Sequence, residues 1–139
     1  SYPRDMNVLV IDDDSDDIEL FREAIYELSS DIVCWTAKDG EEGLRMLTRD
    51  LIVLPDYILL DVNMPLLDGK QTLARIKQHT RLKTIPVFMY STTSNDREIS
   101  HMKTLGARDF IIKPPTFERL VKMLKSVLLK GHVPVPSSR

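Results

Sequence analysis

The 139-residue sequence predicts an α/β fold in which helices cover both faces of one parallel sheet. Two observations support this prediction. Five short apolar runs indicate strands, and their wholly apolar character is typical of strands buried on both faces. Five segments with apolar residues at helical spacing alternate with these runs along the chain. A chain of this length forms a single ordinary domain.

The first part of the chain contributes two strand–helix pairs. Residues 6–11 (MNVLVI) are a short run rich in branched residues and are predicted as the first strand. Residues 16–28 are predicted as a helix because their apolar side chains recur every three or four positions. A second apolar run at 32–36 indicates a strand, and residues 40–49 indicate the helix that follows it.

The same alternation continues to the end of the chain. Residues 57–60 are predicted as the third strand and 69–78 as the next helix. A fourth strand is predicted at 85–90, where a proline near the start is tolerated. The remaining elements are a helix at 96–105, a strand at 110–112 and a last helix that begins after its cap, Thr116.

The expected topology brings polar residues from several strands to one point. Five strand–helix units with right-handed crossovers suit the flavodoxin-like strand order 2-1-3-4-5. In such sheets, ligands bind beyond the carboxyl ends of the strands, where the winding reverses, and the first and third strands are neighbours there. We therefore expect Asp12 and Asp13 to meet Asp61, with Ser91 and Lys113 beside them.

These residue types predict metal-assisted phosphoryl transfer. Three ionised carboxylates repel one another unless a cation neutralises them, and an all-oxygen ligand set suits Mg²⁺. The Ser91 hydroxyl and the Lys113 ammonium are suited to contact a phosphoryl group, with one carboxylate as the nucleophile. Because Asp14 extends the acidic run, the metal-binding pair is either Asp12 with Asp13 or Asp13 with Asp14.

The distribution of charge agrees with a cation site. Residues 1–70 carry 17 acidic and 6 basic side chains, whereas residues 71–139 carry 4 and 13, so the two parts have net charges of −11 and +9. Such a split can mark a polyanion-binding tail or a cation site. The acidic residues cluster at strand ends and the basic ones do not, which favours the cation site.

Several classes of protein are excluded or disfavoured. No apolar run approaches the roughly 18 residues of a membrane span, and no helix-turn-helix pair indicates DNA binding. The single cysteine, Cys34, forbids an internal disulfide and lies in an apolar run, so we expect a buried, inert thiol and a cytoplasmic protein. The alternating Asp12, Asp14 and Asp16 imitate a calcium loop, but Asp17 stands where that loop requires glycine.

Four separated motifs, each following or spanning a predicted strand, carry a resemblance to a known family. They are VLVIDDDSDD (8–17), LLDVNMPLLDG (59–69), IPVFMYST (85–92) and GARDFIIKP (106–114). The chain resembles the receiver domain of two-component response regulators, in particular the single-domain, chemotaxis-regulator-like members. The resemblance covers residues 6–129 and leaves 130–139 as a C-terminal tail that we expect to be flexible. The STTS stretch at 91–94 is also similar to regulators associated with phytochrome-like kinases.

The resemblance implies a phosphorylation site and a metal. Asp61 would accept a phosphoryl group from a histidine kinase or a His-containing phosphotransfer protein, with Mg²⁺ as cofactor. Asp12, Asp13 and Asp61 would hold the ion, together with the backbone carbonyl of Asn63.

The resemblance also implies a switch. Ser91 would follow the phosphoryl group, Phe110 would be the aromatic switch residue, and Lys113 would contact the phosphate. The Lys113–Pro114 bond is expected to be cis, as in most members. Pro115 departs from the family, in which many members have an aromatic residue at that position.

We therefore predict a phosphate-accepting signalling switch and not a turnover enzyme. Its output would be contact with a downstream protein or a second copy through the face formed by residues 96–105, 110–112 and the last helix, without direct contact to nucleic acid or membrane. A haloacid-dehalogenase-type phosphatase is the enzymatic alternative, but Asn63 stands where that enzyme needs a second carboxylate. A flavodoxin-like cofactor binder is disfavoured because the loop after the first strand lacks phosphate-cradling glycines.

Overall fold

One parallel sheet forms the middle layer of the computed structural model, which describes residues 6–92 and 95–134. The strands lie in the order β2-β1-β3-β4-β5, so the predicted topology is confirmed. Each neighbouring pair is parallel. The strands are Asn7–Ile11 (β1), Val33–Ala37 (β2), Tyr57–Asp61 (β3), Val87–Ser91 (β4) and Asp109–Ile112 (β5).

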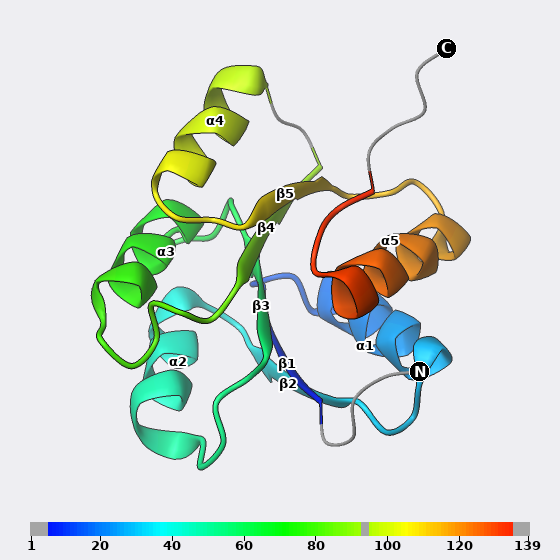
Figure 1. Ribbon diagram of the computed structural model, residues 1–139, viewed down its shortest axis with the longest axis horizontal. Helices are drawn as coiled ribbons and strands as arrows, with labels where there is room; N and C mark the ends of the chain where they lie inside the picture. The colour runs from blue at the N-terminus through cyan, green and yellow to red at the C-terminus, as the bar shows by residue number, and fades with distance from the viewer. Residues whose placement is uncertain (1–5, 93–94, 135–139) are drawn as a thin grey trace.

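The helices alternate with the strands, as predicted, and cover both faces of the sheet. Within the described residues they are Ser15–Leu28 (α1), Gly40–Arg45 (α2), Gly69–Gln78 (α3), Asp96–Thr104 (α4) and Phe117–Lys130 (α5). Figure 1 shows α1 and α5 on one face of the sheet and α2, α3 and α4 on the other. The molecule therefore has three layers, with its hydrophobic core divided between the two faces.

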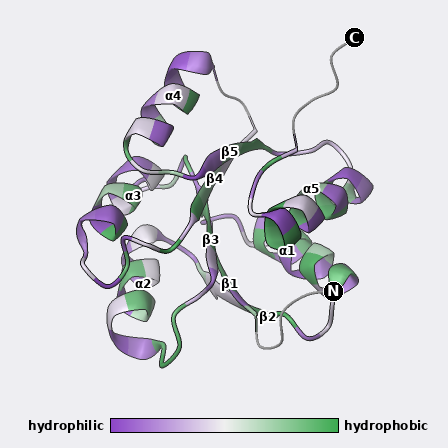
Figure 2. Ribbon diagram, in the orientation of Figure 1, coloured by the Kyte–Doolittle hydropathy of each residue, from purple (hydrophilic) through white to green (hydrophobic). Residues whose placement is uncertain are grey.

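The central strands supply side chains to both halves of the core. Leu9 and Ile11 of β1 pack in a cluster with residues of α3 and α4, whereas Val8 and Val10 pack with residues of α1 and α5. All four are fully buried. The helices in Figure 2 change between hydrophobic and hydrophilic colours along their turns, which is the pattern of helices with one face on a sheet.

Each of these five helices begins at a polar cap. The side chains of these caps accept backbone N–H groups of the first turn, and the caps are Asp14, Asp39, Asp68, Asn95 and Thr116. Thr116 accepts from the Arg119 N–H at 3.2 Å, which confirms the predicted cap. Because each helix follows a strand, its N-terminus lies near the carboxyl edge of the sheet, where oriented N–H groups favour anions.

Strand β2 lies at one edge of the sheet, which exposes side chains that we expected to be buried. Val33 and Trp35 are each 41% exposed, and Cys34 is half-buried. The prediction of a buried thiol holds only in part, because the order 2-1-3-4-5 places β2 at the edge of the sheet, where a strand is covered less completely than the central strands. Burial still raises the pKa of Cys34 to about 11, so the thiol stays protonated at neutral pH.

The helix predicted at 40–49 changes its geometry in its last turn. After α2, residues Met46–Asp50 form a π-helical turn, in which the Leu51 N–H donates to the Met46 carbonyl at 2.9 Å. Leu47 is buried and Leu44 packs against the same core. Such single π turns are rare and have no simple sequence signal.

The loop after β5 departs from the family expectation. None of the described peptide bonds is cis, so the expectation of a cis Lys113–Pro114 bond was wrong. For any bond that precedes a proline, the trans isomer is favoured by about 0.5–1 kcal/mol. Pro115 adds its own constraint, because a residue that precedes a proline is restricted to extended backbone.

The first residues of the predicted tail are held on the domain. The Arg108 guanidinium donates to the Gly131 carbonyl at 3.2 Å, and Ser126 donates to the His132 carbonyl at 3.0 Å. Val133 packs against the core cluster of α1 and α5. Residues 131–134 thus contact the domain, and the expected flexibility of the tail stays a prediction; residues 135–139 lie outside the described residues.

Gly69, the first residue of α3, allows the helix to pass close to the end of β3. A Cβ atom at this position would lie 2.3 Å from the Asp61 carbonyl oxygen and 2.7 Å from the Val62 Cα. Both neighbours are backbone atoms and cannot rotate away. We expect Gly69→Ala to lower the unfolding free energy by about 1–3 kcal/mol, measured by urea unfolding. The comparison is Ala74→Gly in the same helix, and equal effects of the two changes would contradict the predicted clash.

Candidate functional site

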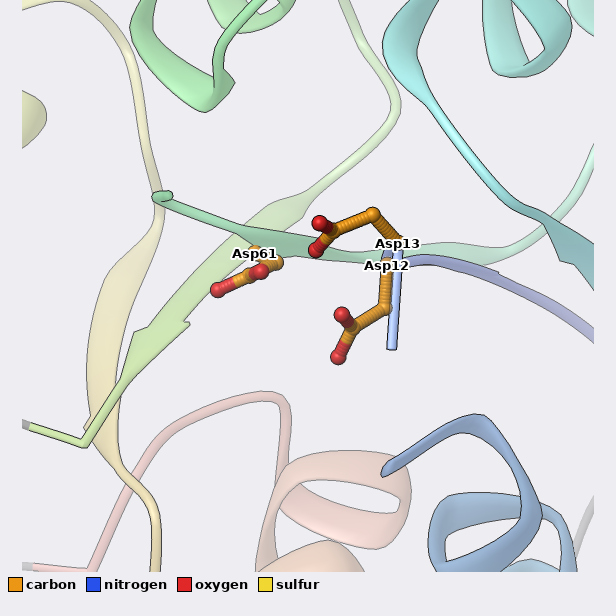
Figure 3. Close-up of side chains that lie close together, drawn as sticks. All are labelled: Asp12, Asp13 and Asp61. Atoms are coloured by element: carbon orange, nitrogen blue, oxygen red, sulfur yellow. The ribbon is translucent and has the colours of Figure 1, made fainter. Parts of the chain in front are cut away.

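Three carboxylates meet at the carboxyl edge of the sheet, as the sequence predicts. Asp12 directly follows β1, and Asp61 ends the neighbouring strand β3. Carboxylate oxygens of Asp12, Asp13 and Asp61 lie within 4.8 Å of one another. Figure 3 shows the adjacent Asp12 and Asp13 side chains leaving the chain in different directions, with the Asp61 carboxylate beside them. Asp12 is fully buried and Asp61 is 6% exposed, whereas Asp13 is exposed.

The structure shows which acidic residues of this run lie near Asp61. The Asp14 side chain caps α1, and its Oδ1 accepts the backbone N–H groups of Asp16 and Asp17 at 2.8 and 3.4 Å. Asp14 is therefore engaged by the helix. Asp12 and Asp13 are the two acidic residues of this run that join Asp61.

The buried Asp12 carboxylate is fixed by hydrogen bonds to both oxygens. Its Oδ1 accepts the backbone N–H of Asp14 at 2.9 Å, and its Oδ2 accepts the hydroxyl of Tyr90 at 2.6 Å. Burial raises the pKa of Asp12, and the Tyr90 and Asp14 hydrogen bonds and the Lys113 charge oppose that rise. Asp12 is thus a buried carboxylate whose charge is only partly compensated by the protein.

Lys113 supplies a positive charge beside the cluster. Its Nζ atom lies 3.8 Å from Asp12 Oδ2 and donates a hydrogen bond to Asp17 Oδ2. Burial would lower the pKa of Lys113, but the hydrogen bond to Asp17 and the charges of Asp12, Asp17 and Asp61 raise it. Lys113 is therefore charged at neutral pH and is shared among several acids.

The environment of Asp61 disfavours the ionised carboxylate in the absence of a bound cation. Burial, and then the charge of Asp12, raise the pKa of Asp61 to about 7, and Lys113 opposes this rise. The backbone N–H of Asn63 donates to Asp61 Oδ1 at 3.4 Å. The Asn63 hydrogen bond and the Lys113 charge do not offset the rise in the Asp61 pKa that burial causes. A further cation would therefore favour the ionised form of Asp61.

Ser91 lies beside Asn63 at the end of β4. The Asn63 amide Nδ2 donates to Ser91 Oγ at 3.4 Å, and Ser91 is buried. Phe110 lies on the face of the sheet covered by α4, where it is buried in the same core cluster as Met89 and Met102. The structure therefore places Ser91 next to the loop that follows β3 and Phe110 in the adjoining core.

The arrangement fits a hard divalent cation. The three carboxylates offer only oxygen ligands, which Mg²⁺ prefers. Lys113 is the basic side chain that the described residues bring into contact with this cluster, and it is also paired with Asp17. Two positive charges from a cation would compensate the remaining carboxylates.

Sequence reasoning missed Tyr90 and Asp17. Asp17 was assigned to the start of α1, and nothing in the sequence indicates its contact with Lys113. Tyr90 carries a usable signal, because a tyrosine in a wholly apolar strand needs a hydrogen-bond partner when it is buried. Side chains alternate between the two faces of the sheet along β4, so the Tyr90 ring lies on the face opposite Ser91. From that face its hydroxyl contacts Asp12.

A known family matches most of the chain. Residues 8–125 match the response regulator receiver domain. The chain belongs to this family. Receiver domains are signalling switches that bind Mg²⁺ and act with histidine kinases or phosphotransfer proteins. The acidic pocket of Asp12, Asp13 and Asp61 is typical of phosphorylation and Mg²⁺ binding in this family.

Similar proteins include both longer regulators and single receiver domains. The probable C4-dicarboxylate response regulator DctR of Bacillus subtilis is 34% identical over 122 residues, which is 88% of this chain and 52% of DctR. The phosphorylated cyanobacterial phytochrome response regulator RcpA is 31% identical, with a TM-score of 0.81 over 93% of this chain and 97% of RcpA. The Mn²⁺-bound form of response regulator Rcp1 is 27% identical, with a TM-score of 0.78 over 94% and 99% of the two chains.

Several of the curated relatives are longer than this chain. The chain spans about half the length of several curated relatives that it matches. Among the described residues, no helix is both long and apolar enough to cross a membrane.

Proposed function

We propose that Asp61 is the phosphoryl acceptor of this receiver domain. A carboxylate oxygen of Asp61 attacks the phosphorus of a partner's phosphohistidine, and the P–N bond breaks. Its electron pair stays on the imidazole nitrogen, which takes up a proton, and Asp61 becomes an acyl phosphate. The observation that supports this best is the proximity of Asp61 to Asp12 and Asp13 at the switch point of the sheet.

The neighbours of Asp61 would each have one task in this reaction. We propose that Asp12, Asp13, Asp61 and the Asn63 backbone carbonyl hold Mg²⁺, which would neutralise charge on the transferred group. Rcp1 has been described with Mn²⁺ bound, which supports a divalent ion at this site. Lys113 would contact a phosphoryl oxygen with its ammonium group.

The proposed output is a change in the α4-β5-α5 face. The phosphoryl group would draw the Ser91 hydroxyl toward it, and Phe110 would repack in the core beside α4. A cavity of about 390 Å³ lies on this face, lined by Ile99, Phe110, Ile112, Met123 and Val133 among others. This groove supports docking of a downstream protein or a second copy at this face.

The donor would be a histidine kinase or a phosphotransfer protein in the cytoplasm. The similarity to the phytochrome response regulator RcpA, which this chain matches over nearly the whole length of both, favours a phytochrome-type kinase. The protonated thiol of Cys34 is compatible with a reducing compartment. We assign residues 6–129 to the receiver domain, in agreement with the family match at 8–125.

Phosphorylation by a small donor tests the assignment of Asp61. The protein is incubated with acetyl phosphate and Mg²⁺ and examined by intact mass spectrometry. We expect one phosphoryl adduct, which is absent after addition of a chelator and absent in Asp61→Asn. Asp56→Asn, a change at an exposed carboxylate before β3, is the matched control and should keep the adduct. An adduct that persists in Asp61→Asn would refute the assignment, and steady release of phosphate with turnover would favour the phosphatase alternative.

A further inference from the structure

Tyr90 makes a buried contact with the acidic cluster that the proposed reaction does not use. It is fully buried in β4, and its hydroxyl donates to Asp12 Oδ2 at 2.6 Å. Its ring packs against Phe21 of α1 with a centroid separation of 4.7 Å. On another side, the Lys113 ammonium lies 4.9 Å from the ring centroid. One side chain thus contacts both an acid of the cluster and the site's lysine.

We propose that Tyr90 is a positioning residue for the Mg²⁺ site, and this inference rests on the metal site proposed above. Its hydroxyl fixes the orientation of the Asp12 carboxylate, and its ring faces the Lys113 ammonium. Groups that orient the ligands of a metal site commonly change metal affinity by 10- to 100-fold when they are removed.

The geometry gives the direction of the effect. Oδ1 of Asp12 is held by the Asp14 N–H, and Oδ2 is held by the Tyr90 hydroxyl. Without that hydroxyl, Oδ2 would lose its short hydrogen bond, while the Lys113 ammonium remains only 3.8 Å away. Oδ2 would then close on the Lys113 ammonium and tighten the ion pair that the two groups already form. That ion pair would compete with the incoming cation, so Mg²⁺ would bind more weakly.

A purely structural role for Tyr90 makes a different prediction. If the hydroxyl only satisfied its own burial, its removal would change the melting temperature and leave the Mg²⁺ affinity unaltered. Metal affinity therefore separates positioning from packing. Tyr57→Phe is a suitable control, because Tyr57 is a partly buried tyrosine at the start of β3, whereas the acidic cluster lies at the opposite end of that strand.

The test is Mg²⁺ binding by isothermal titration calorimetry on the full chain. We expect the dissociation constant of Tyr90→Phe to rise roughly tenfold, and that of Tyr57→Phe to stay within about twofold of the unaltered protein. The change should act through Asp12. In an Asp12→Asn background, Tyr90→Phe should therefore have no further effect on the affinity.

Each outcome decides the proposal. A folded Tyr90→Phe protein with unaltered Mg²⁺ affinity overturns it, as does an undiminished effect of Tyr90→Phe in the Asp12→Asn background. Absence of Mg²⁺ binding in the unaltered protein overturns the metal site itself, and the role of Tyr90 with it. The two failures are therefore distinguishable.

A second measurement needs no change at Tyr90. The protein is labelled with ¹³C at the ζ carbon of its tyrosines, and the Tyr90 resonance is assigned by replacing the other three tyrosines in turn. We expect this resonance to shift saturably with Mg²⁺, while the Tyr26 and Tyr57 resonances stay in place. A Tyr90 resonance that does not respond to saturating Mg²⁺ overturns the proposal even if Tyr90→Phe does not fold.

Discussion

Replacement of Asp61 by asparagine is expected to stabilise the metal-free protein at pH 8 by about 2–4 kcal/mol. Burial and the charge of Asp12 raise the pKa of Asp61 to about 7 in the folded state, against an ordinary value of 3.8. An ionised Asp61 therefore destabilises the fold, and asparagine removes that charge at nearly constant volume.

The sign of the pH dependence follows from proton binding. Between pH 4 and pH 7 the folded protein keeps a proton on Asp61 that the unfolded chain releases. The unfolding free energy of the metal-free protein thus falls as the pH rises through this range. Below pH 4 both states are protonated at Asp61, and the advantage of Asp61→Asn should disappear.

Urea unfolding at several pH values, followed by circular dichroism with a chelator present, measures this effect. Asp50→Asn, at an exposed position in the π-helical turn, is the control and should not alter the pH profile. Saturating Mg²⁺ should reduce the advantage of Asp61→Asn, because the ion neutralises the wild-type cluster. Parallel pH profiles for the wild type and Asp61→Asn would contradict the assignment of the raised pKa to this residue.

The convergence of the site could be predicted because it depends on topology alone. Parallel strands place their carboxyl ends at one edge, so Asp12 and Asp61 meet once β1 and β3 are neighbours. The strands themselves were recognisable because short apolar runs alternate with amphipathic helices. Those signals depend on composition and spacing, which the sequence contains in full.

The remaining features depend on side-chain directions and local geometry, which composition does not contain. The choice between Asp12 and Asp14 as a member of the acidic cluster required the cap of α1. The contact of Tyr90 with Asp12 joins residues 78 positions apart and depends on which face of β4 the ring occupies. The Lys113–Pro114 isomer was inferred from the family, and this chain departs from it.

Replacement of Lys113 by methionine is expected to lower the unfolding free energy of the metal-free protein at pH 8 by about 3–5 kcal/mol, because it leaves a buried carboxylate without its cation. The Lys113 side chain is 18% exposed and that of Asp12 is fully buried, so solvent screens this pair only weakly. Because its acidic neighbours raise the pKa of Lys113, its stabilising charge is fully present at pH 8 and is lost only above pH 10.5. Methionine keeps most of the aliphatic stem, so the loss reports on the charge.

Mg²⁺ should restore much of the stability of Lys113→Met, because the ion supplies the missing positive charge. A ligand at 100 times its dissociation constant adds about 2.7 kcal/mol to a folded state that alone binds it. Lys103→Met is the matched control: Lys103 lies 3.3 Å from Asp109 with half of its side chain exposed, and surface pairs of this kind contribute about 0–1 kcal/mol. Urea unfolding with chelator and with saturating Mg²⁺ measures both variants. If Lys113→Met lost no more stability than Lys103→Met, the carboxylates would not depend on Lys113 to neutralise their charge. A loss of stability that Mg²⁺ reverses would show that the lysine and the metal neutralise the same cluster.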